Sequence, residues 1–354
     1  MIIALLPGDG IGPEITAATR VVLDAVDTRF ALGFEYTEID IGFRALEASG
    51  STLPDSAFEA AKAADALILG PVSHLDYPSR EQGGINPSGE LRKRLDLFAN
   101  IRPAVTRDDL PSRTGATFDM VIYRENTEGF YADRCMYSGT GEVHVTEDVA
   151  IAMRRITRQA CMRIAEASFA GAAQRRGKVT AVHKQNVLRL TDGIFLDCCR
   201  KVAAQYPDIT YEELLIDAAC AHVVRRPEEF DVICTTNMFG DILSDLASEL
   251  SGSLGLAASI NAGDGVAMAQ AQHGSAPDIA GQGIANPASL IGSAGMLLDW
   301  MGGSRGDTNL RNAGRTILKA LDKTIADPAT RTRDLGGDLG TEAFAQAVAR
   351  TIHC

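Results

Sequence analysis

Short apolar segments alternate with helical stretches along most of the chain, and this alternation restricts the possible folds more than any other feature. Residues 1–6 are apolar and lead into a glycine-rich turn, after which Ile15, Val22 and Val26 recur at helical spacing. Five further strand candidates, each near a helical stretch, are Ala66–Leu69, Phe118–Tyr123, Lys178–His183, Thr210–Ile216 and Asp231–Thr235. Strands separated by helices form crossover units that pair mainly in parallel. The sequence therefore predicts an α/β fold with a mostly parallel sheet.

The composition excludes several classes of protein. The 354 residues include 45% hydrophobic side chains, which is enough for a folded core, and the length favours two domains or one large fused unit. Lys and Arg number 34 against 46 Asp and Glu, so the formal charge is −12 and a nucleic-acid partner is not expected. The first apolar run is too short for a signal peptide or a membrane span. Seven cysteines without paired zinc spacing indicate reduced thiols, so we expect a cytoplasmic enzyme with no membrane partner.

Two local expectations concern the middle of the chain. Residues 137–146 are polar and glycine-punctuated, with alternating Val143 and Val145, which is typical of a hairpin or of an arm that reaches a partner chain. The next segment, Glu147–Phe169, places apolar side chains at helical spacing. We therefore expect one long helix over Glu147–Phe169, with its apolar face in the core or at a subunit contact.

A glycine-rich turn, GDGIGPE at residues 8–14, follows the first strand and begins a helix. Backbone N–H groups at such a position can meet an anion or a cofactor. Pro13 stands where the Rossmann fingerprint needs a glycine, so a Rossmann fold is not expected. Taken alone, the segment is a turn about as often as it is a binding site.

Three arginines are candidates for binding a di- or tricarboxylic acid. Arg92 and Arg102 flank the stretch 91–103, and Arg124 ends a strand. Ligands of α/β sheets bind at strand ends, and arginine binds carboxylates through two parallel hydrogen bonds. Without knowledge of the fold, separate surface ion pairs are the simpler interpretation.

Three aspartates are candidate metal ligands. Asp241 and Asp245 are four residues apart in the helical segment Gly240–Leu250, so their carboxylates share one face. A hard divalent cation would relieve their repulsion, and Asp217, at the end of a strand, would supply a third oxygen. A solvated helix start is an equally good interpretation. Lys184 follows the strand Lys178–His183, and Tyr131 follows Arg124 by seven residues, but single residues of these types are weak signals of acid–base catalysis.

A loop of small residues precedes the apolar helix Ala288–Met301. It runs from His273 to Gly281 and continues as Ile284-Ala285-Asn286-Pro287. Glycine, alanine and serine let a flat ligand approach the backbone closely. A tight surface loop is the alternative interpretation.

Together these segments resemble the β-decarboxylating dehydrogenases, a family that includes isocitrate, homoisocitrate, 3-isopropylmalate and tartrate/D-malate dehydrogenases. The motifs are GDGIGPE at 8–14, LRKRLDLFANIRP at 91–103, RENTEGFY at 124–131, HKQNVLRLTDG at 183–193, TTNMFGDILSD at 235–245 and HGSAPDIAG at 273–281. The resemblance implies the two-domain isopropylmalate/isocitrate dehydrogenase-like fold. Residues 1–98 and 253–354 would form a large cofactor-binding domain, and 99–252 a smaller dimerisation domain with an arm near 134–148.

The resemblance also implies roles for the candidate residues. Arg92, Arg102 and Arg124 would bind the substrate carboxylates. Mg²⁺ or Mn²⁺ would be bound by Asp217, Asp241 and Asp245. Lys184 becomes the base and Tyr131 the acid. In this family Lys184 and Asp217 would come from the partner subunit, so a homodimer with shared active sites is implied. The expected cofactor contacts are Ile11, His273, Gly274, Ser275, Ala276, Asp278 and Asn286.

The cofactor and the substrate class follow from a few positions. Asp278 would accept hydrogen bonds from ribose hydroxyls and repel a 2′-phosphate, which predicts NAD rather than NADP. Asn86 and Ser88 precede Arg92; the isopropylmalate enzymes carry leucines at Ser88 and Gly89, whereas isocitrate dehydrogenases carry Ser and Asn at the positions of Asn86 and Ser88. We therefore expect a 3-substituted (2R)-malate with a polar C3 substituent, of the isocitrate or homoisocitrate type. 3-Isopropylmalate and tartrate/D-malate are the alternatives.

Two alternative hypotheses concern proteins of other functional classes. A non-catalytic regulatory subunit of a heteromeric dehydrogenase would bind metabolites and adjust a partner, but such subunits lose catalytic positions that are all present here. A metal-dependent hydrolase would leave the loop at His273 without a purpose. The sequence favours an oxidative decarboxylase that transfers a hydride to NAD.

Overall fold

The computed structural model of the protein describes residues 1–107, 109–110, 112–131, 136 and 141–353. Part of the expected arm, residues 134, 135 and 137–140, lies outside the described residues. The chain forms two units. The first unit consists of Met1–Leu91, Arg107–Leu110 and Ser253–Cys354, and the second of Arg92–Thr106 and Pro111–Gly252. The roles expected for two domains, cofactor binding and dimerisation, stay predictions.

The first unit has a mostly parallel sheet in the order β2-β1-β3-β12-β11. Its strands are β1 (Ile2–Leu6), β2 (Glu35–Glu38), β3 (Ala66–Leu69), β11 (Ile260–Ala262) and β12 (Ala267–Gln270). Only the β11–β12 pairing is antiparallel among these described strands. The helices are α1 (Gly12–Phe30), α2 (Phe43–Ser49), α3 (Asp55–Ala63), α10 (Ala288–Arg305), α11 (Thr308–Ala326) and α12 (Thr341–His353), and α4 (Pro87–Arg94) contains the boundary between the units.

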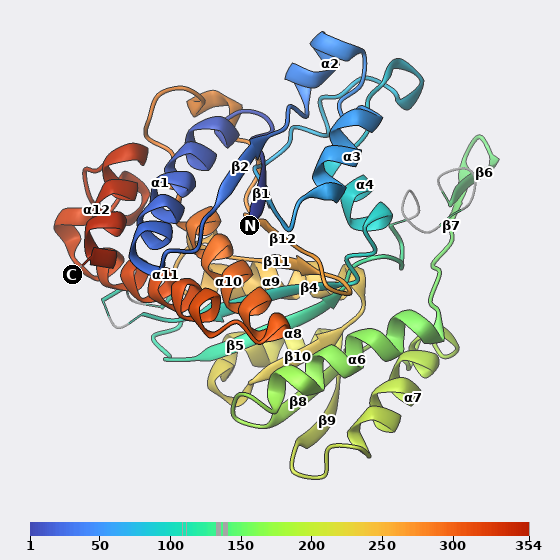
Figure 1. Ribbon diagram of the computed structural model, residues 1–354. Coiled ribbons are helices and arrows are strands. Elements are labelled where there is room, and N and C mark those ends of the chain that lie inside the picture. Colours follow the sequence, from blue (N-terminus) through green and yellow to red (C-terminus); the bar gives the residue numbers. More distant parts are fainter. Residues whose placement is uncertain (108, 111, 132–135, 137–140, 354) are drawn as a thin grey trace. The chain divides into compact units, whose positions relative to one another are not determined.

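Helix α1 shows why this unit folds as it does. Pro13 stands in its first turn, where proline fits because the missing N–H has no partner within the helix. The residues that recur at helical spacing, Ile15, Val22 and Val26, are buried. This apolar face is covered by α10, α11 and α12 (Figure 1).

The second unit has a sheet in the order β4-β5-β10-β8-β9. Its strands are β4 (Ala99–Val105), β5 (Asp119–Glu125), β8 (Lys178–His183), β9 (Thr210–Leu215) and β10 (Val232–Thr235). Strands β4 and β5 pair antiparallel, and the other neighbours pair in parallel. The helices are α6 (Arg158–Ala172), α7 (Thr191–Ala203), α8 (Ile216–Arg225) and α9 (Asn237–Leu250).

Alternate residues of these strands point to two separate cores. In β10, Val232 and Cys234 pack with α6 and α7, whereas Ile233 packs with α8 and α9. Such alternation is the period of a strand buried on both faces. In β5, Met120 and Ile122 belong to the core under α8 and α9. Arg124 follows at the same period, so it also faces α9.

The mostly parallel α/β fold predicted from the sequence is confirmed, and neither unit has the Rossmann strand order. The long helix expected over Glu147–Phe169 is wrong. Its first part forms β7 (Val149–Ala152), which pairs with β6 (Glu142–Thr146), and α6 begins only at Arg158. The hairpin expected around Val143 and Val145 is present, with β7 as its second strand. Among the described helices, none has the length and apolar character to cross a membrane.

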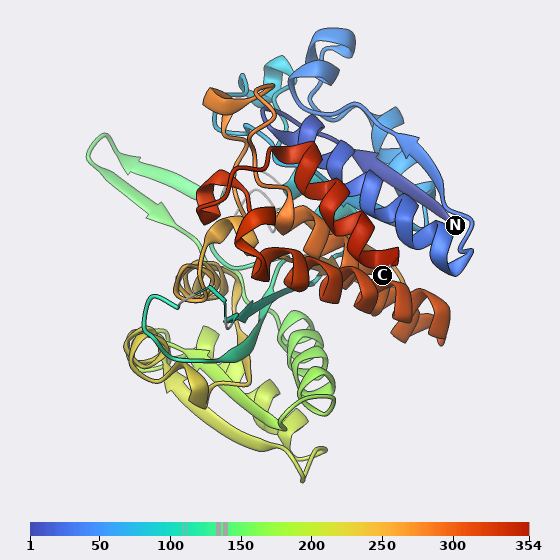
Figure 2. The same cartoon turned by 90° about the vertical axis from the view of Figure 1, so that its left-hand side faces the viewer.

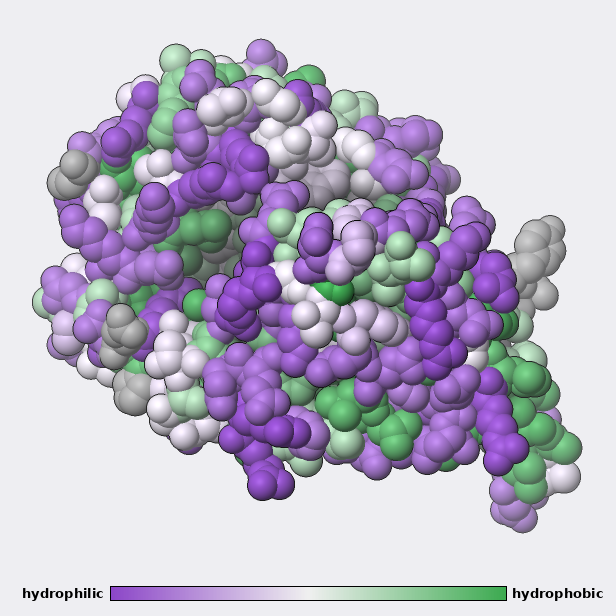
Figure 3. All heavy atoms as spheres, turned by 90° about the horizontal axis from the view of Figure 1, so that it is seen from below, coloured by the Kyte–Doolittle hydropathy of each residue, from purple (hydrophilic) through white to green (hydrophobic). Residues whose placement is uncertain are grey.

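The β6–β7 hairpin has an apolar face that the chain leaves exposed. Val143 pairs with Ile151, and these two side chains are 52% and 53% exposed. Val145, Val149 and Met153 share their alternation and are exposed too. The hairpin extends away from α6 and α7 as an arm (Figure 2), and green side chains gather on it at the lower right of Figure 3. A two-stranded hairpin with one uncovered apolar face is marginally stable in water by itself.

Candidate active site

Two buried arginines lie side by side because of the β4–β5 register. Arg102 is opposite Ile122, and Arg124 is opposite Asn100. The two arginines are therefore diagonal neighbours on the same face of the sheet. The side chains of Arg102 and Arg124 are only 7% and 2% exposed. Arg102 Nε donates a hydrogen bond to Asn100 Oδ1, and Arg124 Nε donates to Asn237 Oδ1 at 2.9 Å.

Helix α9 brings carboxylates onto this arginine pair. Arg102 Nη1 lies 3.2 Å from Asp241 Oδ1, 3.3 Å from Asp245 Oδ1 and 2.7 Å from Ser244 Oγ. Arg124 Nη1 donates a short hydrogen bond to the same Asp241 oxygen. Tyr131 donates its hydroxyl to Asp241 Oδ2 at 2.6 Å, and the Arg124 guanidinium lies 5.3 Å from the Tyr131 ring centre. These five side chains form one cluster, which we call the Arg–Asp cluster: Arg102, Arg124, Tyr131, Asp241 and Asp245.

Burial and mutual charge set the proton affinities in the Arg–Asp cluster. Burial, with the neighbouring Arg124 charge, lowers the pKa of Arg102 to about 10. Burial raises the pKa of Asp241, but Arg124 and Arg102 outweigh it, so the pKa is lowered overall. Burial also raises the pKa of Asp245, and Arg102 does not offset this. An additional cation beside Asp245 would favour its ionised form.

Gly240 allows α9 to approach Arg124, and we expect a larger residue at this position to impair the site. A Cβ on Gly240 would lie 2.6 Å from Arg124 Cβ and 2.7 Å from its Cγ. Gly240→Ala should displace Arg124 and lower kcat/KM by roughly 10²-fold, because small misplacements in a reacting site are costly. Gly193→Ala in α7 is the matched control, since its nearest neighbour, Gln185 Nε2, is 3.6 Å away. Steady-state kinetics of both variants check this; equal activity would contradict it.

Arg92 is buried in the second unit, and its charge contributes to the lowered pKa of Asp241. Its Nη1 donates to Asn126 Oδ1 at 3.3 Å, and Asn126 Nδ2 donates to Leu97 O at 2.9 Å. Only 6% of Arg92 is exposed. Asn126 therefore orients this guanidinium next to the strand end that carries Arg124.

Lys184 and Asp217 form a second pair because they follow neighbouring parallel strands. His183 of β8 is in register with Leu215 of β9, so the segments after these strands lie side by side. Lys184 Nζ donates to Asp217 Oδ1 at 2.6 Å, and this hydrogen bond lowers the pKa of Asp217. No three His, Cys, Asp or Glu side chains in the described part of the chain gather closely enough to hold a metal. One chain thus does not bring Asp217 to Asp241 and Asp245.

Two buried glutamates lie between Arg124 and Tyr131. Glu125 accepts hydrogen bonds from the backbone of Thr127 and Glu128, while Glu128 Oε1 accepts from Thr157 N at 2.7 Å, at the start of α6. Burial raises the pKa of Glu128 to about 7, and the Glu125 charge adds to this, whereas Arg155 opposes it. Burial raises the pKa of Glu125 as well.

The Glu128 carboxyl predicts that stability falls as the pH rises towards 7. Between pH 4.5, the unfolded pKa of this carboxyl, and about pH 7, the native state holds a proton that the unfolded state has lost. The stability that this proton provides is therefore present at low pH and is lost above about pH 7. Glu128→Gln removes this dependence. From pH 7.5 to 5.5 we expect the wild-type melting temperature to rise by about 3 °C or more relative to the variant. Parallel melting curves for the two proteins would contradict the assignment.

The predicted cofactor residues lie on two adjacent turns of the first unit. Ile11 N donates to Ser275 O at 2.8 Å, and a Cβ on Gly10 would lie 2.0 Å from that oxygen. Glycine is therefore required where the GDGIGPE turn meets the loop of Gly274 and Ala276. His273 Nε2 is buried without a hydrogen-bond partner among the described residues, and burial lowers the pKa of this imidazole.

Two further predicted cofactor residues, Asp278 and Asn286, differ in whether their side chains are hydrogen-bonded within the chain. Asp278 is exposed in a short 3₁₀ turn, Pro277–Ile279, and its carboxylate has no partner in the described parts of the chain. Asn286 donates to Asp334 Oδ2 at 2.9 Å and accepts from Ala288 N at 3.0 Å. Asn286 therefore holds the start of α10, whereas Asp278 has a carboxylate available for a ligand.

The residues expected to meet the C3 substituent are mostly engaged within the first unit. Ser88 is 7% exposed; its Oγ lies 3.2 Å from Gln270 Oε1 and accepts from Gln270 Nε2 at 3.0 Å. Asn86 Oδ1 accepts from Gly89 N at 3.2 Å, at the start of α4. Ser88 thus fixes α4 against β12, and the amide N–H groups of Asn86 are the polar groups left for a ligand.

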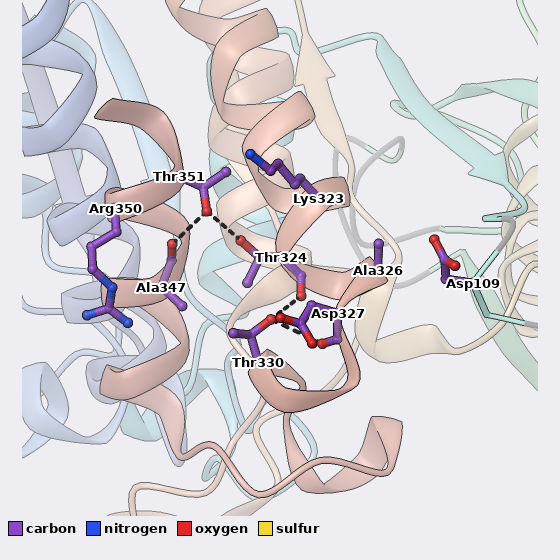
Figure 4. Close-up of a pocket in the computed structure, with 9 residues that line it drawn as sticks. All are labelled: Asp109, Lys323, Thr324, Ala326, Asp327, Thr330, Ala347, Arg350 and Thr351. Atoms are coloured by element: carbon purple, nitrogen blue, oxygen red, sulfur yellow. Dashed lines mark hydrogen bonds between the residues drawn. The ribbon is translucent and has the colours of Figure 1, made fainter. Parts of the chain in front are cut away.

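A surface hollow of about 430 Å³ in the first unit contains none of the predicted site residues (Figure 4). Its lining is Asp109, Lys323, Thr324, Ala326, Asp327, Thr330, Ala347, Arg350 and Thr351. The three threonine hydroxyls donate to backbone carbonyls at Ala320, Thr324 and Ala347. The two cations and the two carboxylates balance in charge, so the hollow does not indicate a ligand class.

Some residues of the site have no clear signal in the sequence. Asn100 shares a strand face with Arg102, and Ser244 follows Asp241 by three residues on a helix, so spacing could have suggested both. Arg154 and Asp192 form a buried ion pair in the second unit. An acidic residue in the first turn of a helix is usually exposed, so nothing in the sequence marks Asp192 as buried.

Comparison with known proteins identifies the family of the chain. The family model for isocitrate/isopropylmalate dehydrogenase matches residues 2–348. An isocitrate/homoisocitrate dehydrogenase of Thermus thermophilus is 42% identical over 352 residues, covering 99% of this chain and 98% of the relative. A 3-isopropylmalate dehydrogenase of Archaeoglobus fulgidus is 43% identical over 353 residues, covering 99% of each. The crystal structure of isocitrate dehydrogenase from Methylococcus capsulatus superposes with a TM-score of 0.88 at 36% identity, covering 100% and 99%. The chain therefore belongs to the isocitrate/isopropylmalate dehydrogenase family, whose members are oxidoreductases.

Proposed function

We propose that the protein oxidatively decarboxylates a 3-substituted (2R)-malate with NAD and Mg²⁺ or Mn²⁺. It acts as a homodimer, in which the Arg–Asp cluster and Arg92 of one chain meet Lys184 and Asp217 of the other. The first unit binds NAD, and the second unit supplies the dimer contacts. The observation that carries this proposal is the Arg–Asp cluster, in which two buried guanidiniums and two carboxylates share one surface.

The ion pairs of the Arg–Asp cluster can exchange partners without leaving a charge uncompensated. Arg102 and Arg124 pair with Asp241 and Asp245 in the chain by itself. A hydroxy acid would give the arginines new carboxylate partners, while a divalent cation would take the aspartates. Substrate and cation therefore fit the cluster better together than either does alone, because one bound without the other leaves buried like charges.

The donor set fits a hard divalent cation. Carboxylate oxygens are the ligands that Mg²⁺ and Mn²⁺ prefer, and Asp241, Asp245 and Asp217 of a second chain supply them. When bound, the cation lowers the pKa of the substrate C2 hydroxyl and stabilises the negative charge that remains as CO₂ leaves.

The chain's own residues carry out the proton transfers. Lys184 accepts the proton from the C2 hydroxyl as C2 gives up a hydride, and the β-keto acid then loses its C3 carboxylate. Arg102 and Arg124 hold substrate carboxylates in place throughout. Tyr131, released from Asp241, delivers a proton to C3.

The first unit is suited to an adenine dinucleotide without a 2′-phosphate. The orphaned His273 Nε2 and the backbone contact at Ile11 and Ser275 supply polar groups beside a small-residue loop. Asp278 leaves its carboxylate available for ribose hydroxyls and would repel a phosphate. We expect kcat/KM to be roughly 10²-fold higher with NAD than with NADP, since two charge-assisted contacts distinguish them. Comparing initial rates with both cofactors checks this, and a preference for NADP would refute the role of Asp278.

The exposed face of the β6–β7 hairpin supports a dimer. Its apolar residues, Val143, Val145, Val149 and Ile151, gain most from a second copy that covers them. In the proposed two-fold dimer, Lys184 and Asp217 of each chain would serve the other chain's cluster, and the described residues of one chain do not bring three candidate metal ligands together.

The substrate is of the isocitrate or homoisocitrate type. Asn86 provides amide N–H groups for a polar C3 substituent, and an apolar wall of leucines is absent at Ser88 and Gly89. 3-Isopropylmalate stays an alternative because relatives with that name are as similar as those named for isocitrate and homoisocitrate. Tartrate and D-malate are the smaller alternatives.

Initial rates of NADH formation test the function. The purified protein with Mg²⁺ or Mn²⁺ is assayed with D-malate, tartrate, isocitrate, homoisocitrate and 3-isopropylmalate, and released CO₂ is measured alongside NADH. We expect the highest kcat/KM with isocitrate or homoisocitrate and equal amounts of CO₂ and NADH. Absence of NADH with every acid would overturn the proposal in favour of a regulatory subunit.

A further inference from the structure

A fully buried carboxylate holds the backbone of the proposed base. Asp192, in the first turn of α7, is 0% exposed. Its Oδ2 accepts a hydrogen bond from Lys184 N at 2.5 Å, and its Oδ1 accepts from Arg154 Nη1 at 2.5 Å. The backbone of Lys184 is thus fixed by a side chain, while its Nζ points to Asp217.

Arg154 extends this contact to segments that adjoin the Arg–Asp cluster in sequence. Its side chain is 7% exposed, and its Nη2 donates to Thr236 Oγ1 at 3.0 Å, directly before α9. Its guanidinium also lies over the rings of Phe130 and Phe239, at 5.9 and 5.5 Å. Phe130 precedes Tyr131, and Phe239 stands two residues before Asp241. One buried ion pair therefore contacts the segments that carry the proposed base, the proposed acid and the metal-binding helix.

We propose that Arg154 and Asp192 are positioning residues that fix Lys184 relative to Tyr131 and α9. This proposal rests on the proposed function. A buried ion pair contributes little net stability compared with a well-packed apolar pair, so its benefit is the geometry that it imposes. In a dimer with shared sites, Lys184 serves the partner's active site, whereas Tyr131 and α9 belong to the chain's own site. Each Arg154–Asp192 pair therefore connects parts of both active sites.

The same strand offers a matched comparison at its other end. Asp231 is 1% exposed; its Oδ2 accepts from Lys178 N at 3.2 Å and its Oδ1 from Arg175 Nε at 2.8 Å. Lys178 begins β8, whereas Lys184 follows its end. Asp231 and Arg175 thus make the same kind of contact as Asp192 and Arg154, but none of their hydrogen-bond partners among the described residues belongs to the proposed site.

The test compares Asp192→Asn with Asp231→Asn in the full-length protein. In each variant one amide oxygen can accept from either the backbone N–H or the arginine, so both should melt at lower temperature than the wild type. We expect kcat to fall by roughly 30- to 100-fold in Asp192→Asn, with less than a threefold change in the KM for NAD. Asp231→Asn should stay within about threefold of wild-type kcat. Equal kcat losses in the two variants, or an unchanged kcat in Asp192→Asn, would overturn the proposal.

A second variant and a second readout keep the test independent of folding and of activity. Arg154→Lys retains the charge but cannot serve Asp192 and Thr236 together, so it should lose kcat to an intermediate degree. Amide hydrogen exchange should accelerate at Lys184 in Asp192→Asn and at Lys178 in Asp231→Asn. Unchanged exchange at Lys184 would refute the positioning contact even if the wild type oxidises no hydroxy acid, and that inactivity would by itself count only against the proposed function.

Discussion

Replacing Lys184 with methionine is expected to lower kcat by roughly 10²–10⁴-fold, the range that general acid–base catalysis supplies. Methionine has a similar length but cannot accept a proton, so the C2 hydroxyl keeps its hydrogen. The KM for NAD should change little, because the residues proposed to contact NAD lie in the first unit. Steady-state kinetics with the preferred hydroxy acid measure both constants.

Lys178→Met is the control for this substitution. Lys178 begins the strand that Lys184 follows, has the same 25% side-chain exposure and pairs with Glu212 at 2.9 Å. The control variant should keep wild-type kcat. A Lys184→Met enzyme with more than about a tenth of wild-type kcat would show that another group takes the proton.

Asp241→Asn is expected to lower kcat/KM by about 10³-fold or more, corresponding to several kcal/mol of lost electrostatic stabilisation. The Asp241 carboxylate lies against Arg102, Arg124 and the Tyr131 hydroxyl, so its charge is central to the cluster. The asparagine amide keeps one oxygen as an acceptor but offers a divalent cation no charge. The variant should therefore also need more Mg²⁺ or Mn²⁺ for half-maximal rate.

Glu249→Gln removes a charge from the same helix at a distance from the cluster and serves as the control. Glu249 pairs with Arg113 at 3.5 Å near the end of α9, and both side chains are more than half exposed. Its loss should leave the rate and the metal requirement unchanged. If Asp241→Asn had a normal rate and a normal metal requirement, Asp241 would not be a metal ligand.

Much of the fold could be predicted because its signals are local. Ala66–Leu69 and Lys178–His183 are strands over the same residues that the sequence predicted. The prediction for residues 147–169 failed because Val149 and Met153 match a helical period as well as a strand period. The local sequence also does not indicate that Val149 in β7 and Met153 just after it are exposed. The predicted helix covers β7 and most of α6, so spacing alone could not divide it.

The candidate site was predictable in its residue types but not in its contacts. Strand β4 was missed because Asn100, Arg102 and Pro103 interrupt its apolar pattern, yet its antiparallel register with β5 brings Arg102 beside Arg124. Asp241 and Asp245 were predictable from helical spacing, but their pairing with buried arginines depends on how α9 packs on the sheet. Residues far apart in sequence meet through tertiary structure, which a single sequence does not display.

Subunit complementation tests most directly whether two chains complete one active site. Lys184→Met and Asp241→Asn proteins, each nearly inactive, are unfolded together and refolded as a mixture, with each variant refolded alone as the control. Random pairing gives hybrid dimers in which one site carries both substitutions and the other carries neither, so the mixture should regain about a quarter of the wild-type rate. Activity no higher than that of the separate variants, with hybrid dimers present by native mass spectrometry, would contradict the shared site.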